Sequence, residues 1–287
     1  MCTFVPDGLE WRYVRAMSDV VSHYAGAGNL AAAIHDALTN AGVAVDGIST
    51  IALAPVDEFH VRGRAATLEI AEALAVDADS SVLDIGSGLG GPARTLAEVI
   101  GCRVTGIDLT PEFCATAAVL SEWTGLGDRT RFVVGDATAL EFADDSFDAA
   151  TTVHVAMNIA DKAAMYREAR RVLKPAGRFV VYDVLQGPGG DVYFPVPWAH
   201  DASTSHLATT EQMRGLLADA GFSVVSETDS SHESREWFTA MAARIAESGP
   251  PPVTFAAFLG SDFAQMARNQ VANLNEDRIR TVTFVCQ

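Results

Sequence analysis

The sequence predicts an α/β fold in which seven strands form a mostly parallel sheet with helices on both faces. Two observations support this prediction. From Ser81 onwards, short apolar runs alternate with segments of helical periodicity, and a glycine-rich turn joins the first of these runs to the first of these helices. Strand, helix and strand in succession form the repeating unit of parallel sheets, so the alternation indicates helices packed against both faces.

In the part of the chain before this alternation, the apolar residues have the spacing of helices. Apolar residues recur every three or four positions, which predicts three helices. These helices are expected over residues 11–24, 30–41 and 64–75. We expect residues 1–75 to form an N-terminal helical cap that contributes to substrate binding.

The central part of the chain supplies five strands. They are predicted over residues 82–85, 103–107, 131–134, 147–153 and 178–184. The helices between them are predicted over residues 92–100, 111–123 and 162–173. The sequence Lys-Pro-Ala-Gly at residues 174–177 is expected to end the last of these helices, because proline and glycine interrupt helical structure.

The C-terminal part adds two strands and several insertions. Residues 186–207 are rich in glycine, proline and aromatic residues, which predicts a long irregular loop. Beyond it we expect helices over residues 210–220, 233–247 and 260–274 and strands over residues 222–227 and 279–285. Residues 76–287 would then form the core, with residues 186–208 and 233–275 as insertions on the substrate side, the latter part of a helical lid.

The composition restricts the partners of the protein. Lys and Arg total 20 against 37 Asp and Glu, and the formal charge of −17 would repel nucleic-acid phosphates and anionic membrane surfaces. The sequence shows no signal-peptide pattern, no bilayer-spanning apolar run and no paired cysteine motif. We therefore expect a cytoplasmic protein with reduced thiols and with no nucleic-acid or membrane partner. Its expected partner is a small-molecule substrate, and the protein could form homo-oligomers.

The glycine-rich turn at residues 82–91, Val-Leu-Asp-Ile-Gly-Ser-Gly-Leu-Gly-Gly, lets a ligand approach the backbone closely. Gly86, Gly88 and Gly91 also have the spacing of the dinucleotide fingerprint, so a nicotinamide-dependent oxidoreductase is the alternative hypothesis. Asp84 helps to separate the two hypotheses. A carboxylate here would face a diphosphate unfavourably but would attract the ammonium group of an amino-acid ligand.

Two further acidic residues follow the next strands. Asp108 ends the second predicted strand, where it can bind ribose hydroxyls, and Asp136 follows the third, where it can accept a hydrogen bond from an adenine amino group. The carboxyl ends of parallel strands are the ligand-binding edge of open α/β sheets. We therefore expect Asp84, Asp108 and Asp136 to line one site.

With these motifs, residues 57–222 resemble the class I S-adenosylmethionine-dependent methyltransferases, which have a Rossmann-like fold. The resemblance is greatest to the group of ubiquinone/menaquinone-biosynthesis, tocopherol and natural-product enzymes. It depends on residues 82–94, 106–110, 135–137 and 171–177. The resemblance implies S-adenosyl-L-methionine as cofactor and a nitrogen, oxygen or carbon atom of a small molecule of secondary metabolism as methyl acceptor. The implied cofactor-binding residues are Asp84, Gly86, Ser87, Gly88, Gly90, Asp108, Leu109, Asp136, Ala137 and His154.

Methyl transfer from a sulfonium requires mainly alignment and exclusion of water, and a base is needed only where the acceptor must lose a proton. His154, after the fourth predicted strand, is the first candidate for such a base, and His60 is the second. Each has an alternative role, in packing or cofactor contact for His154 and in helix capping or at the surface for His60. A third hypothesis for the whole protein is a scaffold that binds the cofactor without transferring methyl.

Two other residue sets are weighed for the site. His200, Asp201 and His206 lie on one loop but match no zinc-ligand spacing, so we expect no metal. Aromatic residues could line a pocket for an apolar or cationic acceptor, although such residues more often belong to a core. This aromatic set comprises Trp11, Tyr13, Tyr24, Phe194 and Trp198.

Overall fold

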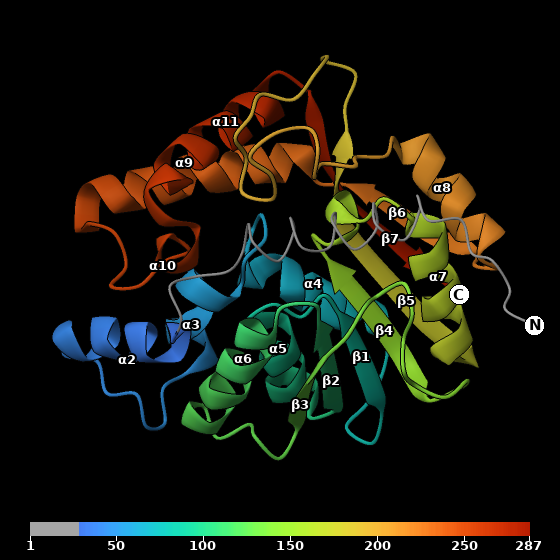
Figure 1. Cartoon of the computed structure of the whole chain (residues 1–287), viewed down its shortest axis with the longest axis horizontal. Coiled ribbons are helices and arrows are strands. Elements are labelled where there is room, and N and C mark those ends of the chain that lie inside the picture. Colours follow the sequence, from blue (N-terminus) through green and yellow to red (C-terminus); the bar gives the residue numbers. More distant parts are fainter. Residues whose placement is uncertain (1–28) are drawn as a thin grey trace, which may run out of the picture.

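The structure, a computed structural model, describes residues 29–287 and contains a seven-stranded sheet with the order β3-β2-β1-β4-β5-β7-β6 (Figure 1). The strands β1 to β5 pair in parallel, and β7 is antiparallel to both β5 and β6. The predicted mostly parallel sheet of seven strands is therefore confirmed. The strands are β1 (Ser81–Ile85), β2 (Arg103–Asp108), β3 (Thr130–Val134), β4 (Phe147–Val153), β5 (Leu173–Gln186), β6 (Val224–Asp229) and β7 (Ile279–Cys286).

Helices cover both faces of this sheet. Side chains of successive strand residues point to opposite faces, so Val82 packs with the core under α4 and α5, whereas Leu83 packs with the core under α7 and α8. The helices of these layers are α4 (Arg64–Leu74), α5 (Gly91–Ile100), α6 (Pro111–Trp123), α7 (Lys162–Val172) and α8 (Thr210–Asp219).

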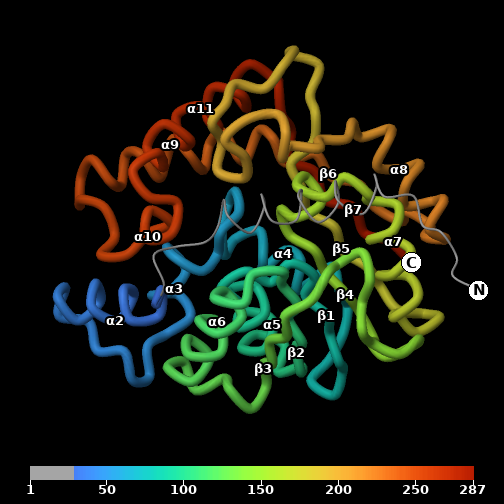
Figure 2. The backbone as a smooth tube through the Cα atoms, viewed as in Figure 1, coloured from blue at the N-terminus to red at the C-terminus, as the bar shows by residue number. Residues whose placement is uncertain are grey.

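A further core joins two parts of the chain that are far apart in sequence. Leu30 and Ile34 of α2 are buried in one cluster with Phe258 and Met266, and Figure 2 shows α2 beside the α10 segment. This places the segment after β6 next to the N-terminal helices. Its elements are α2 (Leu30–Asn40), α3 (Thr50–Asp57), α9 (Ser231–Ser248), α10 (Ala256–Leu259) and α11 (Phe263–Asn275).

Several predicted boundaries were wrong. Helix α7 ends at Val172, and Leu173 already pairs with Phe147 in the sheet, so β5 begins before the Lys-Pro-Ala-Gly sequence and not after it. The register shifts there from the pair Phe147–Leu173 to the pair Ala149–Arg178, which places residues 174–177 in an irregularity of the strand. Proline at position 175 disfavours a helical conformation of the residue before it, which is consistent with the early helix end.

The C-terminal helices also differ from the prediction. The helix expected over residues 260–274 begins as a 3₁₀ turn at Gly260–Asp262 and continues as α11, and Gly260 has a φ of +67°. The short helix α10, which precedes it, had no prediction. Helix α3, which contains Pro55, had no separate prediction. The helix predicted over residues 11–24 lies outside the described residues. No helix of residues 29–287 is both long and apolar enough to cross a membrane.

We predict that Gly91→Ala destabilises the protein by about 1–3 kcal/mol, the usual cost of overpacking. A Cβ atom at Gly91 would lie 2.2 Å from the backbone oxygen of Asp57, and this close contact seats α5 against the end of α3. Chemical denaturation of the wild type and the variant measures the change.

The matched control is Gly215→Ala in the interior of α8, where an added Cβ meets nothing within 4 Å. Alanine there should stabilise the protein by about 0.5–1 kcal/mol because glycine costs more backbone entropy. Equal effects of the two substitutions would contradict the close contact at Gly91.

Candidate active site

The turn between β1 and α5 adopts a conformation that favours glycine. Gly86 and Gly88 have φ values of +77° and +52°, and a Cβ at Gly86 would lie 2.2 Å from the side chain of Val155. The backbone N–H groups of Gly86 and Ser87 both donate to the carbonyl of Ile107, at 2.8 and 3.0 Å. The turn is therefore fixed to β2, and its backbone lines a pocket at the carboxyl ends of the strands.

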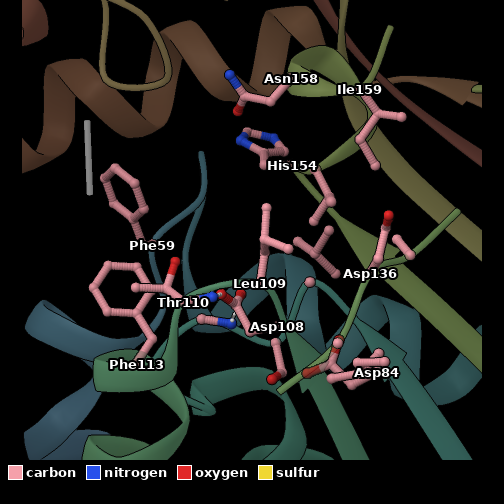
Figure 3. Close-up of a pocket in the computed structure, with 18 of the residues that line it drawn as sticks. Phe59, Asp84, Asp108, Leu109, Thr110, Phe113, Asp136, His154, Asn158 and Ile159 are labelled. Carbon is pink, nitrogen blue, oxygen red and sulfur yellow. Dashed lines mark hydrogen bonds between the residues drawn. The ribbon is translucent and has the colours of Figure 1, made fainter. Parts of the chain in front are cut away.

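Three carboxylates from neighbouring strands meet in this pocket (Figure 3). Asp84 comes from β1, Asp108 ends β2, and Asp136 follows β3. The Asp108 carboxylate accepts the N–H groups of Gly88, at 2.9 Å, and Thr110, at 2.8 Å. These contacts join the turn to the start of α6 around one side chain.

Four buried polar atoms of residues that line the pocket have no hydrogen-bond partner among residues 29–287. They are Oδ1 of Asp57, Oδ2 of Asp84, Oγ of Ser87 and Nε2 of His154, and those of Asp84 and Ser87 lie at the glycine turn. Burial of Asp84, with a further contribution from nearby Glu58 and Asp108, raises the pKa of this carboxyl from 3.8 to about 7. An unpartnered acceptor and an unpartnered hydroxyl donor so close in sequence suit a ligand that brings both an ammonium and a carboxylate group.

The two histidines lie side by side in the same pocket. His154 has a φ of +55°, and its ring centre is 5.9 Å from that of His60 and 4.9 Å from that of Tyr182. The Nε2 atom of His154 is buried and has no partner among the described residues, and burial holds the pKa of this histidine well below its usual value. Burial also lowers the pKa of His60 to about 4. Both rings are therefore neutral at physiological pH.

The predicted cofactor-binding residues and the two candidate bases mostly converge on this pocket. All except Gly90 line it, as Figure 3 shows for Asp84, Asp108, Leu109, Asp136 and His154. Gly90 is instead the N-cap of α5, where a Cβ would lie 2.5 Å from the ring of Phe132. The close packing of Phe132 therefore explains why this position is a glycine. The other predicted residues on the pocket are His60, Gly86, Ser87, Gly88 and Ala137.

The pocket also has an aromatic wall that the sequence did not indicate. Phe59 and Phe113 line it, and the ring of Phe258 packs edge-on against both. The centre of the Phe258 ring is 5.1 Å from that of Phe59 and 5.4 Å from that of Phe113. These phenylalanines come from three distant segments, so no local periodicity could have linked them. Other lining residues that were not predicted include Asn158, Ile159, Ser203 and Thr204.

The aromatic residues proposed from the sequence do not form this wall. Phe194 and Trp198 pack in a separate core with Val184 and Leu274, and Trp198 donates to the hydroxyl of Ser205 at 3.0 Å. Trp11, Tyr13 and Tyr24 lie outside the described residues.

The loop histidines considered as metal ligands are also separated by the fold. Of His200, Asp201 and His206, only His206 lines the pocket. Within residues 29–287, no group of three or more His, Cys, Asp or Glu side chains is placed to hold a metal ion.

A buried ion pair attaches the N-terminal segment to the glycine turn. Arg94 and Asp57 lie 2.7 Å apart and are both almost fully buried, and Arg94 also donates to the carbonyl of Ala117 at 2.9 Å. Although Arg94 partly offsets it, burial raises the pKa of Asp57 to about 6. This pair fixes the end of α3, and with it Phe59 and His60, beside the pocket.

Comparison with known proteins identifies the central part of the chain. Residues 83–181 match the family described as a methyltransferase domain. They form a methyltransferase domain. The resemblance inferred from the glycine turn and the strand-end carboxylates is thereby confirmed.

Relatives of this methyltransferase domain support the same assignment. The chain is 32% identical to methyltransferase GfsG of Streptomyces halstedii over 63% of this chain and 66% of that protein. It is 41% identical to a 2-methyl-6-phytyl-1,4-hydroquinone methyltransferase of Synechocystis over half of each chain. The chain spans about a third to two thirds of the lengths of the first curated relatives it matches.

A solved structure shares the fold over nearly the whole chain. The geranyl diphosphate C-methyltransferase of Streptomyces coelicolor superposes with a TM-score of 0.68, at 16% sequence identity, over 94% of this chain and 97% of that one. The similarity extends beyond the matched domain to the helices on either side of it.

We predict that Asp84→Asn stabilises the ligand-free protein by up to about 4 kcal/mol at pH 8 and by about half as much at pH 5.5. Because the pKa rises from 3.8 in the unfolded chain to about 7 in the folded protein, the cost of burying this carboxyl grows from about pH 4 and levels off above about pH 7. At pH 5.5 the folded carboxyl is protonated but the unfolded one is charged, so part of the cost remains. Urea denaturation at both pH values tests this, and a gain that is the same at both would contradict the assignment of the cost to the Asp84 charge.

Proposed function

We propose that this protein transfers a methyl group from S-adenosylmethionine to a nitrogen, oxygen or carbon atom of a small-molecule acceptor. The observation that carries the proposal is that two buried atoms at the glycine turn, Oδ2 of Asp84 and Oγ of Ser87, have no hydrogen-bond partner within residues 29–287. The amino-acid end of the cofactor offers an ammonium for the first and a carboxylate for the second. Binding would thereby satisfy two groups that the ligand-free protein buries at a cost.

The remaining cofactor contacts follow the strand ends. Asp108 keeps acceptor capacity for ribose hydroxyls besides its two backbone contacts, and Asp136 is placed after β3 for the adenine amino group. Leu109 and Ala137 add apolar surface beside these carboxylates. Gly86 and Gly88 let the backbone approach the methionine part closely.

The wall of the pocket favours an uncharged or cationic acceptor with apolar surface. Phe59 and Phe113 contribute phenyl rings, and among residues 29–287 no Lys or Arg side chain lines the pocket. A phosphate or carboxylate on the acceptor would meet no cation there, and it would lie near the strand-end carboxylates. We propose that residues 186–208, through Ser203 and Thr204, and residues 233–275, through Phe258, shape the acceptor side.

When bound, the sulfonium supplies an electrophilic methyl group, and the protein's contribution is alignment and exclusion of water. The pocket provides alignment through its strand-end carboxylates and its aromatic wall. Where the acceptor must lose a proton, the neutral imidazoles of His60 and His154 are the available bases.

The oxidoreductase alternative is less compatible with this pocket. A dinucleotide would place its diphosphate beside the Asp84 carboxylate, and the described residues on the pocket provide no cation to offset that repulsion. A cofactor-binding scaffold without turnover would share the same contacts. Consumption of S-adenosylmethionine with acceptor candidates distinguishes an enzyme from such a scaffold.

We predict that the protein binds S-adenosylhomocysteine and does not bind NAD⁺ in isothermal titration calorimetry. Asp84→Asn should weaken binding of S-adenosylhomocysteine by at least about 30-fold, since removal of one partner of a buried charge pair costs about 2–5 kcal/mol. Tight binding of NAD⁺ together with no response to S-adenosylhomocysteine would reject the proposal.

Asp183→Asn is the matched control. Asp183 is equally buried, and burial likewise raises its pKa to about 7, but it lies on β5 away from the pocket lining. Its substitution should leave the affinity for S-adenosylhomocysteine within about threefold of the wild type.

We also predict that binding is linked to proton release. The pKa of Asp84 is about 7 in the ligand-free protein, and an ammonium beside it favours the charged form. Affinity should therefore fall as the pH is lowered from 8 to 6, by nearly tenfold per unit at the acidic end. Titrations at pH 6.5 in two buffers of different ionisation enthalpy should show up to one proton released by the wild type and none by Asp84→Asn.

A further inference from the structure

His60 lines the pocket and is hydrogen-bonded to buried groups that do not line it. The Nε2 atom of His60 lies 2.9 Å from the carbonyl oxygen of Gly63 and 3.2 Å from Oγ1 of Thr67. Oγ1 of Thr67 in turn donates to Oε2 of Glu58 at 2.6 Å, so this hydroxyl can only accept from the histidine. Because a carbonyl oxygen also only accepts, Nε2 must carry the proton.

This assignment leaves Nδ1 of His60 with a lone pair. Both hydrogen-bond contacts of the ring within residues 29–287 are made by Nε2, and His60 lines the pocket. A histidine with one nitrogen held as a donor and the other left as an acceptor has the tautomer that a general base requires.

Glu58 is held as the charge partner of this histidine. Its side chain is 1% exposed, and its Oε2 lies 3.7 Å from Nε2 of His60. Its Oε1 accepts from Thr95 at 2.7 Å, and the Thr95 hydroxyl itself accepts from Arg64 at 2.7 Å, so both threonine hydroxyls donate to Glu58. Burial raises the pKa of Glu58, and the two donated hydrogen bonds act against this rise in favour of the carboxylate form, which would stabilise an imidazolium at His60.

His154 lacks such an arrangement. Within residues 29–287 its Nε2 is buried without a partner, and its ring packs against those of Tyr182 and His60. No carboxylate of the described residues is hydrogen-bonded to it, and a positive charge on it would face His60. Of the two histidines, only His60 has both a fixed tautomer and a group to stabilise its charged form.

We infer that His60 is the general base of this site, that Glu58 is its positioning residue, and that the acceptor is one whose methylated atom loses a proton, such as a hydroxyl. The inference rests on the proposed methyl transfer and names its acceptor class. A tertiary amine, which has no proton to lose, would need neither residue.

The proton and charge balance is complete without a further reactant. The acceptor oxygen forms a bond to the methyl carbon, and the carbon–sulfur bond breaks with its electron pair going to sulfur. The hydroxyl proton moves to Nδ1 of His60. The positive charge thus passes from the sulfonium to the imidazolium, which later releases the proton to water.

Other charged and titratable groups also face His60. Asp57 from the end of α3 favours its protonation, and Arg62 from the following turn opposes it. His154 after β4 and Tyr182 from β5 complete the surroundings. These groups are unchanged in the variants chosen below.

Nitrogen NMR of the full chain labelled with ¹⁵N-histidine tests the tautomer without any acceptor, with His60→Asn used to assign the signals. The expected result at neutral pH is a neutral ring protonated at Nε2. Protonation at Nδ1 would overturn the inference. Because this result does not depend on cofactor binding, it is independent of the calorimetric test of the proposed function.

Turnover supplies the second measurement, with an alkylated hydroquinone as the hydroxyl acceptor. His60→Asn should lower kcat by about 100-fold or more at pH 7, the usual contribution of a general base. The loss should shrink as the pH approaches the pKa of the acceptor, which then ionises without help. A loss that is equal at every pH would indicate a structural role and overturn the inference.

A pair of matched variants separates the effect of the Glu58 carboxylate on turnover from an effect on folding. Glu58→Gln should show a smaller loss, of about tenfold, with the same recovery at high pH, and its affinity for S-adenosylhomocysteine should stay within threefold of the wild type. Glu69→Gln is the control, because Glu69 is an exposed carboxylate on the same helix as Thr67 and contacts Arg62. Equal behaviour of the two variants would exclude Glu58 as the positioning residue.

Discussion

The site is organised around a buried carboxylate that forms no ion pair with any Lys, Arg or His of residues 29–287. Asp84 lies near the carboxyl end of β1, and its Oδ2 has no hydrogen-bond partner within residues 29–287. A group in this state costs free energy in the ligand-free protein, and a cationic ligand would recover it. Stability and binding therefore oppose each other at this residue, which is common where a site is formed before its ligand arrives.

The opposite side of the pocket depends on contacts between the N-terminal segment and α5. The Asp57–Arg94 ion pair and the close approach of Gly91 to the Asp57 backbone bring the end of α3 beside the glycine turn. Removing one partner of a buried ion pair typically costs about 3–5 kcal/mol, so this junction is a strong constraint. It positions Phe59 and His60, neither of which belongs to the sheet.

Much of the candidate site could be predicted because its signals are local. Asp84, Asp108 and Asp136 each follow or end a strand that the apolar runs reveal, and parallel strands bring their carboxyl ends to one edge. Gly90 shows the limit of this reasoning. It belongs to the glycine-rich turn, and the resemblance implied a cofactor contact for it, but its small size is needed beside the Phe132 ring. The sequence pattern cannot separate these two reasons for a glycine.

The sequence by itself determined the sheet, its strand-end carboxylates and the glycine turn, because periodicity and turn chemistry act over a few residues. Only the tertiary structure decided that Phe59, Phe113 and Phe258 share a wall, and that Glu58 and Thr67 fix the tautomer of His60. It also decided that Phe194 and Trp198 belong to a separate core. The physical reason is that contacts between distant segments depend on how the helices pack against one another, and the local spacing of apolar residues does not specify this packing.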